Sequence, residues 1–250
     1  MVYVTGDIHG QPRRVVNFAK DVHISRSDVL IILGDVGANY YLNELDNECK
    51  RRLNSIKCTI FCIHGNHECR PEHVSSYRLV DWNGGKVWVE DAYPRILFAK
   101  DGEIYNIEGQ RYLVIGGAYS IDAYWRIRRH AGWWQDEQPT EAIKAYVEAQ
   151  VANNEVDIVL SHTCPRKYEP IEVFLPNVYQ SGVDKSTENW LDTIEDKLQY
   201  KAWYCGHWHT DKHIDKIHFL FRSWETIEKE APNETDQLFT TRRNNEASIP

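Results

Sequence analysis

Short apolar runs alternate with helically spaced apolar residues over the first third of the chain. The runs cover residues 2–5, 28–33 and 58–63, and each has the length of a strand. The second run is almost wholly apolar, which is typical of a strand that is buried on both faces of a parallel sheet. Apolar residues at helical spacing follow the first two runs: Val15, Phe18, Ala19 and Val22, then Leu42, Leu45, Cys49 and Leu53. This order predicts strand–loop–helix units and a largely parallel sheet, with ligands at the carboxyl ends of its strands.

The pattern changes after about residue 80. Short segments of alternating polarity follow, and they predict antiparallel strands of a second sheet. These segments lie at 86–89, 95–98, 103–107 and 111–115. Later strands are predicted at 157–160, 202–205 and 214–221, and helices at 143–151 and 190–198. We expect one α/β domain over residues 1–227, with an insertion at 116–139 and a polar, weakly ordered tail at 228–250.

Composition narrows the class of protein. Of the 250 residues, 42% are apolar, which excludes wholesale disorder. No apolar run approaches the ~20 residues that cross a bilayer. The chain enters an apolar strand directly at Val2, without the features of a signal peptide. We therefore expect a soluble, cytoplasmic protein with no membrane partner.

Charge and cysteine content argue against two further classes. A formal net charge of -8 argues against general binding to nucleic acid, because such binding depends on a basic surface. The six cysteines form no C-x-x-C pair, and several lie in apolar strands. Reduced cysteines in the core are therefore expected in preference to a zinc cluster.

Polar side chains follow the predicted strands at the points where these strands end. In an extended segment Asp7 and His9 project to the same side, as do His207 and His209. The candidate metal ligands are Asp7, His9, Asp35, Asn66, His162, His207 and His209. They are too many for one tetrahedral zinc ion and suit two divalent ions that share a carboxylate. The mixture of nitrogen and oxygen donors favours manganese, with iron or zinc as alternatives.

This set of ligands also predicts phosphate chemistry. Two divalent ions and a bridging hydroxide outweigh the carboxylates of Asp7 and Asp35 by about one positive charge, which would attract a phosphoryl group. The hydroxide can attack phosphorus in line while the ions stabilise the oxyanions. His67 lies beside the ligand Asn66, and its imidazolium could protonate the leaving alkoxide as a general acid.

Five motifs, in this order, resemble those of the calcineurin-like metallophosphoesterase superfamily. They are Gly6-Asp7-Ile8-His9-Gly10, Gly34-Asp35, Gly65-Asn66-His67-Glu68, His162 and Gly206-His207-Trp208-His209. The resemblance covers about residues 4–210, and it is nearest to uncharacterised bacterial and phage-encoded members. It implies a four-layer sandwich of two mixed β-sheets flanked by helices.

The resemblance also implies how two metal ions divide the ligands. One ion would bind Asp7, His9, Asp35 and His209, and the other would bind Asp35, Asn66, His162 and His207. Asp35 would thus bridge the ions. His67 would lie near the substrate.

The sequence departs from the phosphoprotein phosphatase branch of the superfamily. Asp35 is followed by Val36-Gly37-Ala38-Asn39, where that branch has x-x-Asp-Arg-Gly. Ala38 replaces the Asp that orients the general-acid His, and Asn39 stands at the position of a phosphate-binding Arg. Protein phosphatase activity is therefore not expected, and Asn39 becomes a candidate substrate-binding residue.

The insertion at 116–139 is rich in aromatic and basic residues, and two interpretations remain open. It is either a solvated basic loop or a substrate cap in which Arg126, Arg128 or Arg129 replaces the missing Arg. Arginine suits phosphate oxygens and aromatic rings suit a base. The cap would therefore select a small phosphate ester or a nucleotide-like substrate.

Together these features predict a metal-dependent phosphoesterase with a dinuclear centre. A phosphodiesterase is preferred to a phosphomonoesterase, because the residues of the protein phosphatases are missing. The alternative is a non-catalytic metal-binding scaffold with the same fold, although a scaffold has no need of His67 beside a complete set of ligands. The sequence leaves the physiological substrate and the oligomeric state open.

Overall fold

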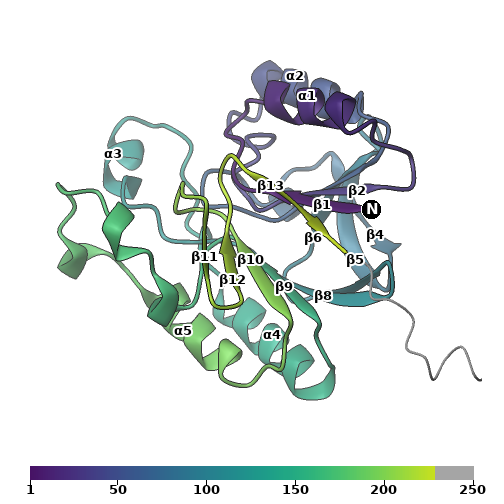
Figure 1. The fold of residues 1–250 in the computed structure, drawn as a ribbon. Coiled ribbons are helices and arrows are strands. Elements are labelled where there is room, and N and C mark those ends of the chain that lie inside the picture. Colours follow the sequence, from purple (N-terminus) through teal and green to yellow (C-terminus); the bar gives the residue numbers. More distant parts are fainter. Residues whose placement is uncertain (229–250) are drawn as a thin grey trace, which may run out of the picture.

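Two β-sheets lie face to face at the centre of the molecule, and helices cover their outer faces (Figure 1). The structure is a computed structural model, and it describes residues 1–228. Both sheets combine parallel and antiparallel neighbours, so the predicted four-layer α/β sandwich is confirmed. Apart from residue 228, the tail predicted at 228–250 lies outside the described residues.

The first sheet has seven strands, four of which are parallel neighbours at its centre. In spatial order the strands are β13 (Trp224–Ile227), β1 (Val2–Thr5), β2 (Val29–Ile32), β3 (Thr59–Cys62), β6 (Ile96–Ala99), β5 (Gly85–Glu90) and β4 (Tyr77–Trp82). The antiparallel strands β13 on one side and β5 and β4 on the other complete the sheet. The fully buried strands β1 and β2 explain the apolar runs in the sequence.

The second sheet has six strands, with a parallel centre and an antiparallel strand at each edge. In spatial order they are β11 (Lys212–Ile214), β12 (Ile217–Phe219), β10 (Ala202–Cys205), β9 (Ile158–Ser161), β8 (Gln110–Ile115) and β7 (Ile104–Ile107). Five of the parallel strands, β1, β2, β3, β9 and β10, end in the loops that carry the predicted ligands.

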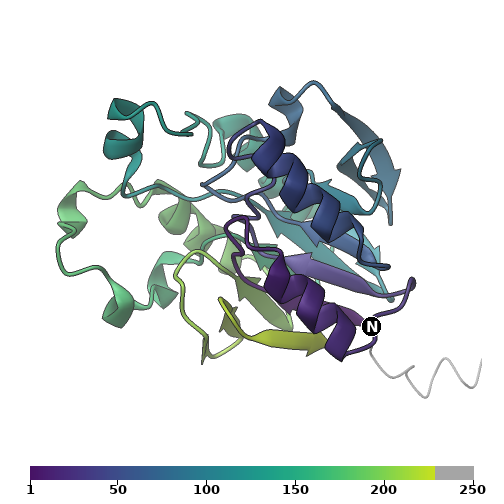
Figure 2. The same ribbon diagram turned by 90° about the horizontal axis from the view of Figure 1, so that it is seen from above.

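Helices form the two outer layers (Figure 1), and the two helices that cover the first sheet lie side by side in front of it in Figure 2. They are α1 (Arg13–Asp21), α2 (Glu44–Asn54), α3 (Ala123–Arg128), α4 (Glu141–Asn153) and α5 (Ser186–Glu195). Short 3-10 turns lie at Pro71–His73, Arg166–Tyr168, Ile171–Val173 and Gln180–Gly182. α1 and α2 cover the first sheet and α4 and α5 the second, whereas α3 stands apart with the segments around residues 165–185 (Figure 1).

Three apolar clusters hold these layers together. The largest fills the space between the sheets, where Phe61 of the first sheet and Tyr112 and Leu160 of the second are buried in one cluster. The other two lie beneath the helix pairs, as Leu53 of α2 and Ile194 of α5 illustrate. Burying one large apolar side chain stabilises the fold by about 1.5–3 kcal/mol, so the sandwich depends on all three clusters.

Several strand predictions are corrected by the structure. The segments 86–89 and 95–98 belong to the first sheet, where β6 pairs parallel with β3, and only 103–107 and 111–115 join the second sheet. Alternating polarity identifies a half-buried strand but not its partner, which is why the assignment was wrong. The single strand predicted at 214–221 is instead an antiparallel hairpin of β11 and β12.

The prediction that Leu42 and Leu45 lie on a buried helix face is also wrong. The helical spacing placed both on a buried face, but α2 begins only at Glu44, and both leucines are exposed. Asn43 caps this helix by accepting a hydrogen bond from the amide of Leu45 (2.9 Å). The cap places the start of the helix beyond Leu42.

The cysteine prediction is confirmed, since all six cysteines are free and buried. Within residues 1–228, none of the helices has both the length and the apolar character that a membrane span requires.

A buried carboxylate lies on α5. Glu188 is 2% exposed, and its Oε1 accepts a hydrogen bond from Thr163 Oγ1 (2.9 Å), whereas its Oε2 has no partner within the described part of the chain. Burial raises the pKa of Glu188 from 4.5 to about 7. The folded state therefore holds this proton more tightly than the unfolded chain does.

We expect Glu188→Gln to flatten the dependence of stability on pH. In the wild type the contribution of Glu188 is fully present below pH 4.5 and is lost as pH rises to about 7, which amounts to about 3 kcal/mol. Urea denaturation of both proteins at several pH values measures the difference. If the free energy of unfolding varied with pH in the same way in both proteins, Glu188 would ionise normally in the folded state.

Candidate metal centre

The loops that follow five parallel strands, three in one sheet and two in the other, meet at one end of the sandwich. β1, β2 and β3 of the first sheet deliver Asp7 and His9, Asp35, and Asn66 with His67. β9 and β10 of the second sheet deliver His162, and His207 with His209. All seven predicted ligands therefore reach one region, because strands of two facing sheets end there.

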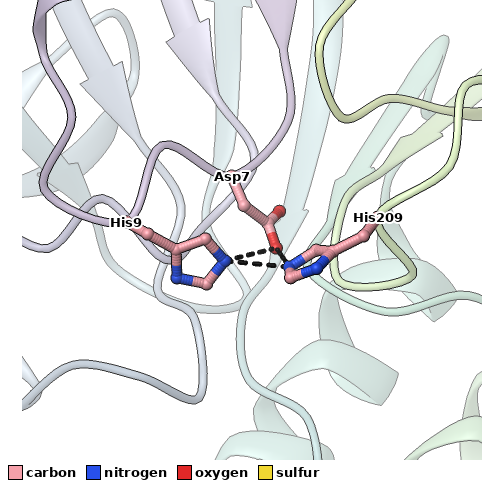
Figure 3. A group of neighbouring side chains, drawn as sticks. All are labelled: Asp7, His9 and His209. Atoms are coloured by element: carbon pink, nitrogen blue, oxygen red, sulfur yellow. Dashed lines mark hydrogen bonds and ion pairs between the residues drawn. The ribbon is translucent and has the colours of Figure 1, made fainter. Parts of the chain in front are cut away.

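One group of ligands consists of Asp7, His9 and His209 (Figure 3). The Nε2 atoms of the two histidines lie 2.8 Å apart. Asp7 Oδ2 lies 3.2 Å from His209 Nε2 and 3.7 Å from His9 Nε2. Asp7 is 2% exposed, and its Oδ2 has no hydrogen-bond partner among the described residues. A buried carboxylate oxygen that faces two imidazole nitrogens fits a divalent cation.

A second group lies around Asn66. Its Oδ1 lies 2.8 Å from His162 Nε2 and 3.1 Å from His207 Nδ1. Asp35 lies between the groups: its Oδ1 is 3.5 Å from His162 Nε2, and its Oδ2 is 3.8 Å from His9 Nδ1. The arrangement fits two cations with Asp35 shared between them.

The backbone at the ligands is strained. His9, Asp35, His207 and His209 have φ values of 44°, 46°, 63° and 50°, in the left-handed region that residues with a side chain rarely adopt. Such conformations persist where the surrounding structure enforces them, and they cluster at functional sites. Glycines allow the close approach: a Cβ on Gly34 would lie 2.2 Å from His162 Nδ1, and one on Gly206 would lie 2.2 Å from Asp7 Oδ1.

Protonation states in the centre suit metal binding. Burial opposes the ionisation of Asp7, but the close approach of His209 and the charges of His162 and His9 outweigh it and lower the pKa of Asp7. Burial lowers the pKa of His207 well below its usual value. An ionised Asp7 and a neutral His207 are the forms that coordinate a cation.

His67 lies at the edge of the centre. Its amide donates a hydrogen bond to Asp35 Oδ1 (2.8 Å), and its ring lies edge-on to that of His9 and stacks at 6.4 Å from Tyr40. Burial lowers the pKa of His67, and the charges of Arg126 and His9 act in the same direction, whereas the carboxylates of Asp35 and Asp122 act in the opposite direction. Asp122 is therefore a second carboxylate that acts on His67, and it comes from the insertion rather than from position 38.

Glu68 holds the loop between β3 and these ligands. It is fully buried, and its Oε1 accepts from the amide of Gly65 (3.0 Å) and, more weakly, from that of Val36 (3.5 Å). Burial raises the pKa of Glu68 to about 8. These contacts give Glu68 a structural role in the loop.

The four predicted substrate-binding residues lie elsewhere. Asn39 is fully buried, and its Oδ1 accepts a hydrogen bond from the Tyr77 hydroxyl. Arg126 is 1% exposed, whereas Arg128 and Arg129 are exposed and lie over the rings of Tyr124 and Trp125. None of the four lines the cavity beside the centre. Asn39 and Arg126 are thus buried in protein contacts, whereas Arg128 and Arg129 are exposed, and a substrate role for the four residues stays a prediction.

Arg126 supports a predicted metal ligand through Ser120. Its guanidinium donates to Ser120 Oγ (2.5 Å), to the carbonyl of Gly132 (2.7 Å) and to Asp122 Oδ1 (3.1 Å). Ser120 Oγ also accepts from Asn66 Nδ2 (2.8 Å). This contact turns the carbonyl oxygen of Asn66 toward His162 and His207. Sequence reasoning missed Ser120, because its role depends on a fold of the insertion that no periodicity predicted.

Fold and site together define an α/β protein with a metal centre at the strand ends. The profile of the calcineurin-like phosphoesterase family matches residues 1–211, and the chain belongs to this family. The protein is therefore a metal-dependent phosphoesterase. No match is found among curated proteins.

Solved structures share the fold at low sequence identity. The crystal structure of TT1561 of Thermus thermophilus aligns with a TM-score of 0.53 and 14% identity, over 92% of this chain and 98% of that chain. The phosphopantetheinyl hydrolase (PptH) from Mycobacterium tuberculosis aligns with a TM-score of 0.45 and 14% identity, over 88% of this chain and 87% of that chain. The first of these likenesses supports the fold.

We expect Arg126→Ala to weaken metal binding while leaving the protein folded. Loss of three hydrogen bonds from a buried cation should lower the free energy of unfolding by about 2–4 kcal/mol and free Asn66 to rotate. Calorimetric titration with Mn²⁺ and urea denaturation measure the two effects. The matched control is Arg128→Ala, two residues away and exposed. Equal metal affinity in both variants would contradict the supporting role of Arg126.

Proposed function

We propose that the protein hydrolyses small phosphate esters at a centre of two divalent ions, with manganese favoured and phosphodiesters preferred to monoesters. The observation that carries this proposal is the pair of ligand groups that converge on Asp35. Asp7, His9 and His209 would hold one ion, and Asn66, His162 and His207 the other. We place this activity in the cytoplasm.

The ions would supply a hydroxide nucleophile at neutral pH and stabilise charge on the phosphoryl oxygens. The chain's own residues then orient the ester. The Asp35 carboxylate fixes the loop of His67 through its amide, so the imidazole faces the cavity beside the centre. From there His67 is placed to give a proton to the leaving oxygen. Burial and the charge of Arg126 lower the pKa of His67, whereas the carboxylates of Asp35 and Asp122 act toward the protonated form that this role requires.

Two hollows beside His67 support a preference for diesters, whose phosphorus carries two organic groups. His67 lines a cavity of about 450 Å³. Tyr40, which stacks on His67, lines a more open groove together with Trp133 and Trp134. The aromatic groove suits a planar group such as a base. Tyr119, Ile121 and Asp122 of the insertion line the cavity, which supports its role as one side of a substrate cap.

A non-catalytic scaffold with the same fold is the second candidate. It would need the metal ligands for stability but would have no use for a cavity that opens on them. The cavity and the inward-facing His67 therefore favour catalysis. Activity assays separate the two candidates directly.

We expect Asp35→Asn to abolish metal-dependent turnover. The amide removes the shared negative charge, and loss of the second ion should lower kcat/KM by at least about 10²–10³-fold. The assay uses chelator-treated protein with Mn²⁺ restored, and compares bis-p-nitrophenyl phosphate with p-nitrophenyl phosphate. The control is Asp21→Asn on the exposed end of α1. Absence of metal-dependent turnover in the wild type on either ester would support the scaffold.

We expect His67→Ala to slow the hydrolysis of esters, and to slow it more for esters with a more basic leaving group. An alkoxide needs a proton as it departs, so kcat for an alkyl ester should fall by about 10²–10⁴-fold in the variant. The p-nitrophenolate ion leaves without a proton, so kcat for a p-nitrophenyl ester should fall far less. Rates for a series of leaving groups measure this dependence, and the Mn²⁺ content of the variant serves as control. A uniform loss across the series would exclude His67 as the proton donor.

A further inference from the structure

We propose that the organic group of the substrate is an uncharged, apolar chain or ring, held in the cavity between the candidate centre and the segment 173–185. This inference rests on the proposed function. It concerns the part of the substrate that does not react, and it is carried by the walls of the cavity rather than by the metal ligands.

The cavity opens directly onto the candidate centre. Asp35, Asn66, His67, His207 and His209 form one end of it. Its volume of about 450 Å³ is within the range of pockets for small ligands. A phosphoryl group at the centre would therefore have its organic group inside the cavity.

The walls are mainly apolar and come from segments distant in the sequence. Val173, Phe174, Leu175 and Val178 follow β9, and Ile121 faces the cavity from the insertion after β8. Leu175 and Ile121 are 58% and 48% exposed, so they offer apolar surface that the fold itself does not cover. Covering such surface with an apolar ligand is favourable.

The charged residues of the walls disfavour a second anionic group. Asp122, Asp184 and Glu188 contribute carboxyl groups, and Lys185 is the one Lys or Arg among the lining residues. Lys185 already lies 2.9 Å from Glu169 and over the rings of Phe174 and Trp208. A polyphosphate or an acidic chain would lose its hydration here without gaining a free cation as partner, which is unfavourable. An uncharged chain has no charge to desolvate.

Competition by alkyl phosphates tests this inference. Methyl, butyl and octyl phosphate, each below its critical micelle concentration, compete with bis-p-nitrophenyl phosphate on the Mn²⁺-loaded protein. The inhibition constant should fall by about fourfold for each methylene that enters the cavity, and an alkyl phosphate whose chain ends in a carboxylate should bind more weakly than its uncharged analogue. In the wild type, affinity should rise from methyl to octyl phosphate. Leu175→Asp and Val178→Asp should each reduce this rise in affinity by at least about tenfold.

The control variant is Leu79→Asp, which places the same charge at an exposed leucine of β4 that does not line the cavity. It should retain the full dependence on chain length. Metal-dependent hydrolysis with inhibition constants that ignore chain length would overturn the inference and leave the proposed function intact. Absence of metal-dependent hydrolysis in the wild type would overturn the proposed function, and this inference with it.

Discussion

The packing of imidazole nitrogens against buried carboxylates is the interaction on which the site depends. His9 and His209 bring two ring nitrogens within 2.8 Å of each other beside Asp7, whose Oδ2 lacks a hydrogen bond within the described chain. Such a group is unfavourable in a protein interior unless a cation or a shared proton neutralises it. The fold therefore places these side chains where a bound cation would stabilise them.

Strained loops make this packing possible. Four predicted ligands adopt positive φ, and the first glycine of a motif lets one loop approach a predicted ligand of another, as Gly34 approaches His162. Each strained residue costs about 1–3 kcal/mol, which the apolar clusters of the sandwich must offset. Each of these loops starts at the end of a buried parallel strand, which anchors one end of the loop in the sheet.

Much of this arrangement could be predicted from the sequence, because its signals are local. Asp7 and Asp35 directly follow apolar runs, and parallel strands bring such residues to one edge. The sheet that contains 95–98 could not be predicted, since its pairing with β3 is a long-range choice that alternating polarity does not encode. The role of Arg126 also escaped prediction: a basic residue among aromatic ones looks exposed, but its three hydrogen bonds exist only in the folded insertion.

The insertion joins the two halves of the site in one structural unit. Ser120 hydrogen-bonds to the predicted metal ligand Asn66, and the next residues, Ile121 and Asp122, line the cavity. Arg126 holds both ends of this short stretch, because it donates to Ser120 and to Asp122. A ligand that pressed on Ile121 would therefore act on the same short segment that orients Asn66. One buried guanidinium thus contacts both the residue that orients Asn66 and a residue that lines the cavity, which links the candidate metal centre to the shape of the cavity.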